Sequence, residues 1–531
     1  MAIDRRAFLK ASAAHAAVVG LAASGCALTH PGAAPIARGA NPFRHGVASG
    51  DPLADRVILW TRVSPFEDRL GEPVETHWWI ARDSLGLDVV AGGVVQAQAD
   101  RDYTVKIDAT GLAPATDYSY GFLTRTGLSP IGRTRTLPQG EVDHVRMAFV
   151  SCANYPQGFF NAYRCLAERD DLDVVLHLGD YLYEYANGEY GDGTALGRIP
   201  DPVEEAISLE DYRRRHATYK ADRDLQAAHA RHPWITIWDD HESANNSNPL
   251  GAENHDPETE GDWTTRKLAA IRAYHEWMPI RELPTGHYRR FEFGSLLDLI
   301  MLDTRLHGRD PEVAKRDEAG AADPSRTLLG RDQEQWLFEA LSDSARAGAV
   351  WRVLGQQIMV APVSFDGIDF NPDSWNGYRG SRDRLLEYIG AESIDNVVFL
   401  TGDVHSSWVF EVPAPGGGQK AAARAVEFVT PAVSSPALGE TGVWKKRRER
   451  LHARTPHLKY SNFDDHGFVV LDLTPARVHA EYVYTESPQV SSGSSWCGAA
   501  FDVPSGTNRV ERVVSDRCPA STGVEPAAGA S

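Results

Sequence analysis

The feature that most constrains this chain is a series of short apolar runs, beginning near residue 141, that alternate with helical patterns and end in polar residues. The runs occupy residues 146–150, 174–178, 234–238, 297–302, 350–354 and 397–401. Continuous apolar runs of this length fit strands that are covered on both faces. Helical patterns at residues 158–170, 262–278 and 333–345 separate them. We therefore predict an α/β layered domain over residues 141–487.

A β-rich region over residues 41–140 precedes this domain. Residues 56–63 and 77–80 are β-branched and aromatic runs between turn residues. Leu112, Pro114 and Tyr118 have the spacing of a tyrosine corner, in which the tyrosine hydroxyl binds nearby backbone in fibronectin-like sandwiches. We predict a fibronectin/immunoglobulin-like β-sandwich that is a structural module packed on the following domain.

The two ends of the chain differ from these domains in composition. In residues 1–40, Arg5 and Arg6 precede a weakly apolar, alanine-rich run, a pattern that resembles a twin-arginine signal. This run is shorter than the roughly 20 apolar residues that span a bilayer, and no later segment is long and apolar enough. We expect export by the Tat machinery to a periplasmic or extracellular location. Cys26 is a candidate for attachment of a lipid anchor. Residues 488–531 are rich in Ser, Gly and Pro and are predicted to form a loosely ordered tail.

The net charge of the chain argues against a nucleic-acid partner. The formal net charge is −19, and a nucleic-acid surface would need clustered lysine and arginine. The same carboxylates could hold multivalent cations. Cys497 and Cys518 could pair in an oxidising compartment, whereas Cys165 lies in a helical pattern and is expected in the core.

Polar side chains of unusual chemistry follow five of the predicted strands. They are Cys152, Asp180–Glu184, Asp239–Glu242, Gln356–Gln357 and Asp403–His405. Three consecutive ionisable residues directly after an apolar strand are costly unless they are paired or bind metal. Buried salt bridges and helix caps would explain any single motif. Because ligands gather at the carboxyl ends of strands in open α/β sheets, their coincidence predicts a site that holds metal ions.

Several motifs together resemble the PhoD-type alkaline phosphatases, members of the calcineurin-like metallophosphoesterase superfamily. The matching segments are His45–Pro52, Leu59–Arg62, Gly179–Glu184, Asp240–Glu242, Glu276–Arg281, Leu302–Arg305 and Gly402–His405. The resemblance extends from about residue 41 to 485. It implies a metallophosphoesterase catalytic domain behind the sandwich.

The resemblance also implies a ferric ion beside one or two calcium ions. Fe(III) would take Cys152, Asp180, Tyr183 and His405, and Ca(II) would take Asp180, Asp240, Asp403 and Gln357. Thiolate and phenolate are strong donors suited to Fe(III), while carboxylate and amide oxygens suit calcium. Taken singly, Cys152 could be a small buried hydrophobe and Tyr183 a packed aromatic. The wider superfamily has an Asp-x-His pair where this chain has Cys152 and Asn154, as the PhoD-type pattern expects.

Three further residues are candidates for contact with a phosphate ester. His241 could bind the phosphoryl oxygens or protonate the leaving alkoxide. Asn245 could donate to the phosphate or complete calcium coordination, and Arg379 could provide a fork for the anionic ester. Arg305 could instead be a structural partner of Asp303.

The activity implied is that of an alkaline phosphatase, in which a metal-bound oxide or hydroxide releases phosphate from monoesters. No Gly-x-Ser-x-Gly segment suggests a side-chain nucleophile. A phosphodiesterase or phospholipase-D-like activity on the same site remains an alternative, because pocket width decides between them. A non-catalytic extracellular binding module is the other alternative. In such a module, each metal ion would more often be fully coordinated by protein ligands.

Overall fold

The computed structural model describes residues 40–283, 286–314, 317–365, 368–369, 371–416, 421–441, 448–514 and 518. Two large sheets dominate these residues. The ten-stranded sheet has the order β23 (Glu511–Val513), β22 (Ser495–Pro504), β21 (Arg477–Thr485), β20 (His466–Leu473), β8 (Val145–Val150), β9 (Val174–His177), β10 (Pro233–Thr236), β1 (Val47–Gly50), β2 (Arg56–Arg62) and β5 (Thr104–Thr110). The seven-stranded sheet has the order β11 (Arg289–Phe293), β12 (Leu297–Met301), β13 (Trp351–Gly355), β16 (Val397–Thr401), β18 (Ala423–Val429), β17 (Ser407–Pro413) and β19 (Leu458–Asn462).

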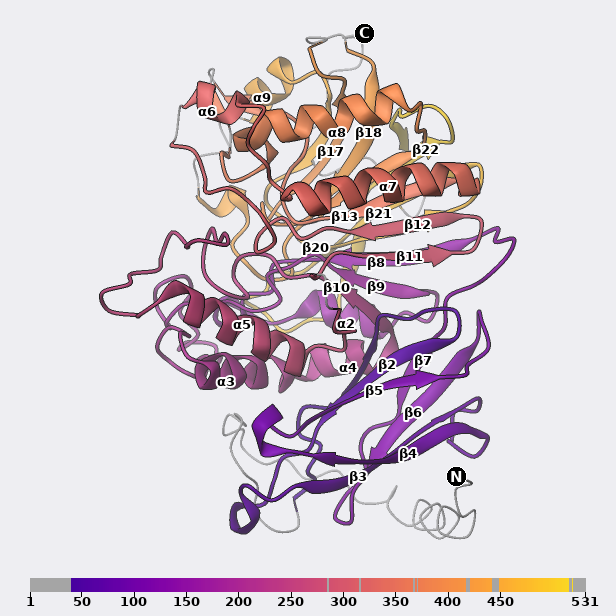
Figure 1. The fold of residues 1–531 in the computed structure, drawn as a ribbon, viewed down its shortest axis with the longest axis vertical. Helices are drawn as coiled ribbons and strands as arrows, with labels where there is room; N and C mark the ends of the chain where they lie inside the picture. Colours follow the sequence, from indigo (N-terminus) through magenta and orange to yellow (C-terminus); the bar gives the residue numbers. More distant parts are fainter. Residues whose placement is uncertain are drawn as a thin grey trace.

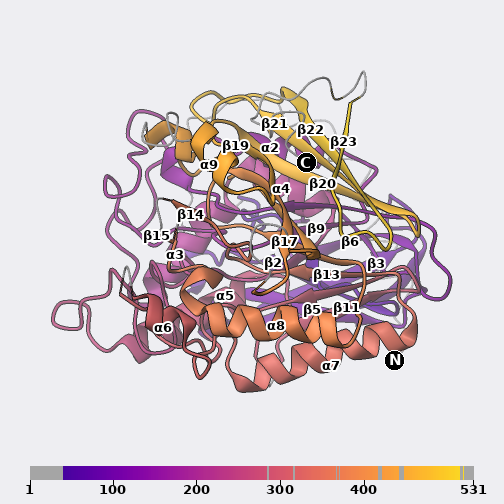
Figure 2. The same cartoon turned by 90° about the horizontal axis from the view of Figure 1, so that it is seen from above.

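Helices cover the outer faces of both sheets (Figure 1). On the seven-stranded sheet, α7 (Arg331–Ala347) and α8 (Arg379–Ala391) lie side by side in both views (Figures 1 and 2). On the ten-stranded sheet, α2 (Asn161–Ala167) and α4 (Arg223–Arg231) pack against β8, β9 and β10. The remaining helices are α3 (Leu209–Lys220), α5 (Trp263–Trp277), α6 (Glu318–Ala322) and α9 (Arg448–Arg454), and β14 (Ser364–Phe365) pairs with β15 (Ile368–Asp369). The α/β layers predicted from the apolar runs are therefore present.

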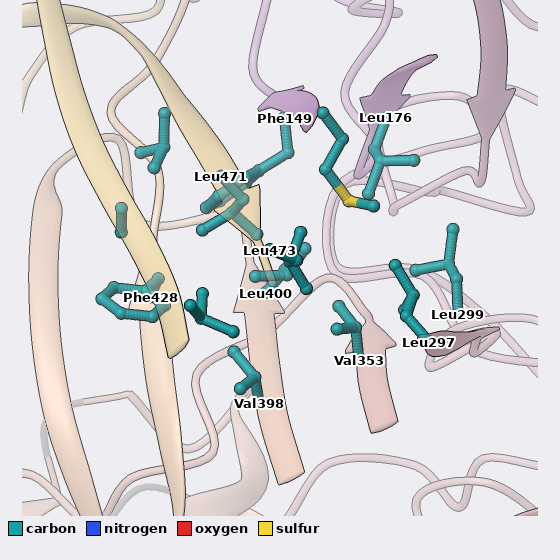
Figure 3. Packing of buried hydrophobic residues seen from close by; sticks show 14 of the residues in the cluster. Phe149, Leu176, Leu297, Leu299, Val353, Val398, Leu400, Phe428, Leu471 and Leu473 are labelled. Atoms are coloured by element: carbon teal, nitrogen blue, oxygen red, sulfur yellow. The ribbon is translucent and has the colours of Figure 1, made fainter. Parts of the chain in front are cut away.

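The largest apolar core lies between the two sheets. Phe149 and Leu176 from the ten-stranded sheet face Leu299 and Val353 from the seven-stranded sheet, and all four are buried (Figure 3). Burying a side chain of this size contributes about 1.5–3 kcal/mol, so this layer holds the sheets in a fixed relation. Their strand ends are thereby fixed relative to one another.

The N-terminal region has its own apolar core between a four-stranded sheet and one end of the ten-stranded sheet. The four-stranded sheet β4 (Val89–Ala97), β3 (Val74–Ala81), β6 (Asp117–Leu123) and β7 (Gly132–Arg135) packs on β1, β2 and β5. The hydroxyl of Tyr118 accepts from the backbone N–H of Ala113 at 2.9 Å, as a tyrosine corner does. β1 pairs in parallel with β10, so one sheet continues from this region into the following one.

Part of the segment expected to be a loose tail is instead ordered. β22 pairs antiparallel with β21 over Ser495 to Pro504, and Cys497 forms a disulfide with Cys518. Small residues made this segment look like a linker, yet Ala499 and Phe501 are buried in the core between the sheets. The twin-arginine pattern and Cys26 lie outside the described residues. Among the described helices, none is long and apolar enough to cross a membrane.

Candidate metal centre

Strands from both sheets bring the predicted ligands together at one edge of the fold. Cys152 follows β8, Asp180 follows β9, Asp240 follows β10, and Asp403 and His405 follow β16. Three groups of potential ligand atoms result, each with all atoms within 4.8 Å of one another. The groups are Cys152, Asp180 and His405; Asp180, Asp240 and His241; and Asp239, Asp240 and Asp403. Because Asp180 and Asp240 each belong to two groups, the three form one continuous centre.

The backbone at this centre is strained. Cys152, Asp180, Asp403 and His405 have φ values of 63°, 54°, 64° and 51°. A non-glycine residue in this left-handed region is uncommon and costs about 1–3 kcal/mol. Such strain persists only where the surroundings enforce it, and here four of the predicted ligands share it. This coincidence is hard to explain by core packing alone.

Two glycines allow the ligand loops to approach closely. A Cβ atom at Gly179 would lie 2.3 Å from the Cβ of Asp239, and one at Gly402 would lie 2.8 Å from the Cβ of Ser151. Any side chain at either position would push the loops after β9 and β10, or those after β8 and β16, apart. The glycine before each aspartate therefore makes the short ligand distances possible.

We call Cys152, Asp180, Tyr183 and His405 the thiol side of the centre. The Tyr183 hydroxyl lies 2.8 Å from Asp180 Oδ2 and 3.1 Å from His405 Nε2, and Ser435 Oγ donates to it at 2.7 Å. His405 Nδ1 contacts the carbonyl oxygen of Pro436 at 3.2 Å. A carbonyl only accepts, so Nδ1 carries the proton and Nε2 presents its lone pair to the centre. A backbone carbonyl orients metal-binding histidines in this way.

The thiol-side donors are buried and protonated when no cation is near. Burial, together with the charge of Asp180, raises the pKa of the Cys152 thiol and of the Tyr183 phenol well above their usual values. A bound cation would reverse this by favouring thiolate and phenolate. Such donors suit a hard, highly charged ion such as Fe(III).

We call Asp239, Asp240 and Asp403 the carboxylate side. Asp240 Oδ2 accepts from the backbone N–H of Asn246 at 2.7 Å. Its Oδ1 atom and Oδ1 of Asp180 are buried and accept no hydrogen bond from the described residues. A buried carboxylate oxygen without a donor is costly. These oxygens fit a hard cation such as calcium, which takes oxygen ligands.

His241 lies where the two sides meet. Its Nδ1 is 2.8 Å from Glu184 Oε2, and its ring packs on Tyr183 with centroids 4.2 Å apart. Burial lowers the pKa of His241, but the carboxylates of Asp240, Glu184 and Asp180 outweigh burial and raise the pKa well above its usual value. Without a bound cation, these carboxylates favour the charged form of His241, and its Nδ1 is oriented by Glu184.

Comparison with known proteins settles the family. The profile of the PhoD-like phosphatase family matches residues 147–482, and the profile of its N-terminal domain matches residues 28–138. The chain belongs to the PhoD-like phosphatase family. It is 39% identical over 463 residues to alkaline phosphatase D of Bacillus subtilis (strain 168), covering 83% of this chain and 77% of that protein. The solved structure of PhoD superposes with a TM-score of 0.82 at 34% identity, covering 91% of this chain and 94% of that one.

In this PhoD-like phosphatase, the side chains of three predicted site residues form bonds with other residues of the fold. Gln357 accepts from the Thr304 hydroxyl and donates to the Leu302 carbonyl at 2.8 Å, so its amide is used within the fold. Arg379 forms an ion pair with Glu318 at 2.7 Å. The Asn245 side chain donates to Glu253 at 3.1 Å.

Conversely, the structure adds residues that the sequence left unassigned. Asp239 joins the carboxylate side, although only its neighbour Asp240 was predicted as a ligand. Glu242 accepts from the backbone N–H groups of Asp180, Tyr181 and Asp239 at 3.1, 2.6 and 2.8 Å. One carboxylate thus holds the loops after β9 and β10 together. The run of ionisable residues after β10 was visible in the sequence. The sequence did not show which of them would join the ligands and which would hold the loops together.

Proposed function

We propose that this PhoD-like phosphatase is an alkaline phosphatase that releases phosphate from monoesters in a metal-dependent reaction. The observation that carries the proposal is the continuous centre in which three ligand groups share Asp180 and Asp240. Adjacent cation sites with a shared carboxylate are typical of phosphoric ester hydrolysis. The domain division proposed is a signal over residues 1–40, a sandwich over 41–140 and a metallophosphoesterase domain over 141–487.

The division of donors supports one iron and one or two calcium ions. Cys152, Tyr183 and His405 would hold Fe(III), Asp180 would bridge, and Asp240, Asp403 and Asp239 would hold Ca(II). When bound, these cations supply an activated nucleophile derived from water and offset negative charge on the phosphoryl oxygens.

The side chains of the protein contribute position and a proton. His241, whose Nδ1 is fixed by Glu184, would donate a hydrogen bond to the phosphoryl group or a proton to the leaving oxygen. Glu242 keeps the loops that carry Asp180 and Asp240 in register. Burial of Cys152, Asp180 and Asp240 strengthens the electrostatic contacts of the centre, while Asp403 and His405 are partly exposed.

Two substrates and a chelator test the assignment. Full-length protein should release phosphate from an aryl phosphate monoester, lose the activity in EGTA and regain it with calcium. A bis-aryl diester is the matched comparison, since it carries the same leaving group. If the diester is turned over far faster than the monoester, the phosphodiesterase alternative replaces the phosphatase. Full activity without any metal would refute the proposed centre.

The export route is a separate part of the proposal. The Arg5–Arg6 pair supports the Tat machinery as partner, and a periplasmic or extracellular location follows from it. Changing both residues to lysine should leave folded precursor inside the cell, as fractionation would show. A Cys26→Ser variant tests the lipid anchor through loss of membrane association.

A further inference from the structure

A single arginine lies within the carboxylate side of the centre. The Arg305 guanidinium is fully buried and contacts four carboxylates. Nη1 donates to both oxygens of Asp373 at 2.6 and 2.8 Å, and Nε donates to Asp239. Nη2 lies 3.2 Å from Asp403 Oδ1 and 3.7 Å from Asp240 Oδ1. Three of the four carboxylates are thus the carboxylate side itself.

The charges in this cluster do not balance. Four carboxylates share the guanidinium of Arg305, Arg309 also pairs with Asp373, and the His241 ring lies beside Asp240. An arginine keeps its charge even when buried. Carboxylates brought this close repel each other strongly unless a cation compensates them. Arg305 therefore supplies part of the positive charge that the carboxylate side needs, and it leaves the rest to a bound cation.

We propose that Arg305 is a resident cation of the carboxylate side. It keeps Asp239, Asp240 and Asp403 together in the metal-free protein, and its charge limits how tightly the site binds a divalent cation. This role rests on the proposed function, in which the carboxylate side holds calcium. Arg305 is a positioning residue and has no assigned contact with substrate.

The carboxylates have supports that do not depend on Arg305. The Asp239 backbone N–H donates to Glu242 at 2.8 Å, and Asp240 accepts from Asn246. The loop of Asp403 is fixed by the hydrogen bond from the Gly402 N–H to the Gln357 carbonyl at 2.8 Å. Loss of the guanidinium would therefore remove charge from the site more than it would alter the positions of the ligands.

Arg309 provides a matched control. Its side chain is also fully buried, and it binds Asp373, the Thr304 carbonyl and the Tyr378 hydroxyl. Among the described residues it forms no ion pair with Asp239, Asp240 or Asp403. Replacing it removes the same charge from the same network without touching the carboxylate side.

The test measures thermal unfolding of the full chain in EGTA and across a calcium titration, for the natural protein, Arg305→Gln and Arg309→Gln. Both variants should unfold at lower temperature in EGTA. Only Arg305→Gln should show a larger gain from calcium, by about 2 °C or more, with the midpoint at about tenfold lower calcium. Equal calcium gains in Arg305→Gln and the natural protein would overturn the proposal.

A second variant covers the case in which Arg305→Gln does not fold. Asp373→Asn removes the carboxylate that binds Nη1 of Arg305. More of the guanidinium charge then acts on the calcium ligands, so calcium binding should weaken about threefold or more. An unchanged midpoint would overturn the proposal. Phosphatase activity of the natural protein with and without calcium distinguishes a failure of the Arg305 role from a failure of the calcium site. Calcium-dependent activity with equal thermal gains refutes only the role of Arg305, whereas no calcium gain in the natural protein refutes that role and the calcium site together.

Discussion

The two sides of the metal centre compensate negative charge in different ways. On the carboxylate side, Arg305 contributes a permanent positive charge from within the chain. On the thiol side, Cys152 and Tyr183 contact the neutral hydroxyls of Ser151 and Ser435, and Tyr183 also donates to the Asp180 carboxylate. Among the described residues, no lysine or arginine forms an ion pair with Asp180, the carboxylate of the thiol side. The thiol side therefore depends on its ion, and we expect it to retain that ion under conditions that empty the carboxylate side.

The largest effect should come from Asp180, the residue that joins the two sides. Asp180→Asn keeps the size of the side chain and removes its charge, so both ions should bind weakly. We expect kcat/KM for an aryl phosphate to fall on the order of 10³-fold, because several kcal/mol of charge stabilisation are lost. Metal analysis should show both metals depleted. Loss of one metal with full retention of the other would show that the two sides are independent.

Tyr183→Phe should separate the two sides. The ring and its packing on His241 remain, and only the donor oxygen is removed. If Tyr183 binds Fe(III), the natural protein is coloured by charge transfer from phenolate or thiolate, and the variant should be bleached or shifted. Activity should fall about 100-fold with iron content reduced and calcium content unchanged. A colourless natural enzyme with full activity would remove Cys152 and Tyr183 from the ligand set.

Glu242→Gln should affect both sides equally. The amide nitrogen would face one of the three backbone N–H donors that the carboxylate now accepts, so the loops after β9 and β10 should lose their register. We expect a loss of about 10- to 100-fold in activity or metal affinity, the range seen when supports of metal ligands are removed. Glu242→Ala should be worse. A variant that loses only one metal would assign Glu242 to one side.

The smallest effect should follow a change outside the centre. Tyr118→Phe removes the hydroxyl that binds Ala113 in the N-terminal region. One neutral hydrogen bond contributes about 1 kcal/mol, so denaturant unfolding should shift by about that amount. Metal content and kcat should not change. A loss of metal here would mean that the N-terminal sheets transmit strain to the centre through β1.

Most of the centre could be predicted from sequence, because its residues stand directly after apolar runs. Asp180, Asp240, Asp403 and His405 all follow this rule and meet as expected. Gln357 follows it equally well, yet its amide bonds to Thr304 and Leu302. Residue order does not reveal the direction in which a side chain points. For the same reason the sequence could suggest Asp303 as a partner for Arg305 but not the more distant Asp239, Asp373 and Asp403.

The fold was predictable where the spacing of apolar residues in a short segment indicates one type of element. It was less predictable where a strand pairs with a segment far away in the sequence. The runs of residues 146–150 and 397–401 became β8 and β16 nearly unchanged. The pairing of β1 with β10 could not be foreseen, since four residues contain too little periodicity to choose a sheet. β22 was hidden because serine, glycine and proline are typical of linkers, although residues 498–501 within it are buried and the strand pairs with β21.

The order of strands in the ten-stranded sheet also bears on how the protein is made. β8, which leads into Cys152, pairs on one side with β9, its near neighbour in sequence, and on the other with β20, from the last part of the chain. While a ribosome is still synthesising the protein, β8 is an exposed edge that could pair with another chain. Its proper neighbour exists only once residues 466–473 have been translated. Insertion of metal at Cys152 should therefore follow the translation of residues 466–473, once β20 has paired with β8.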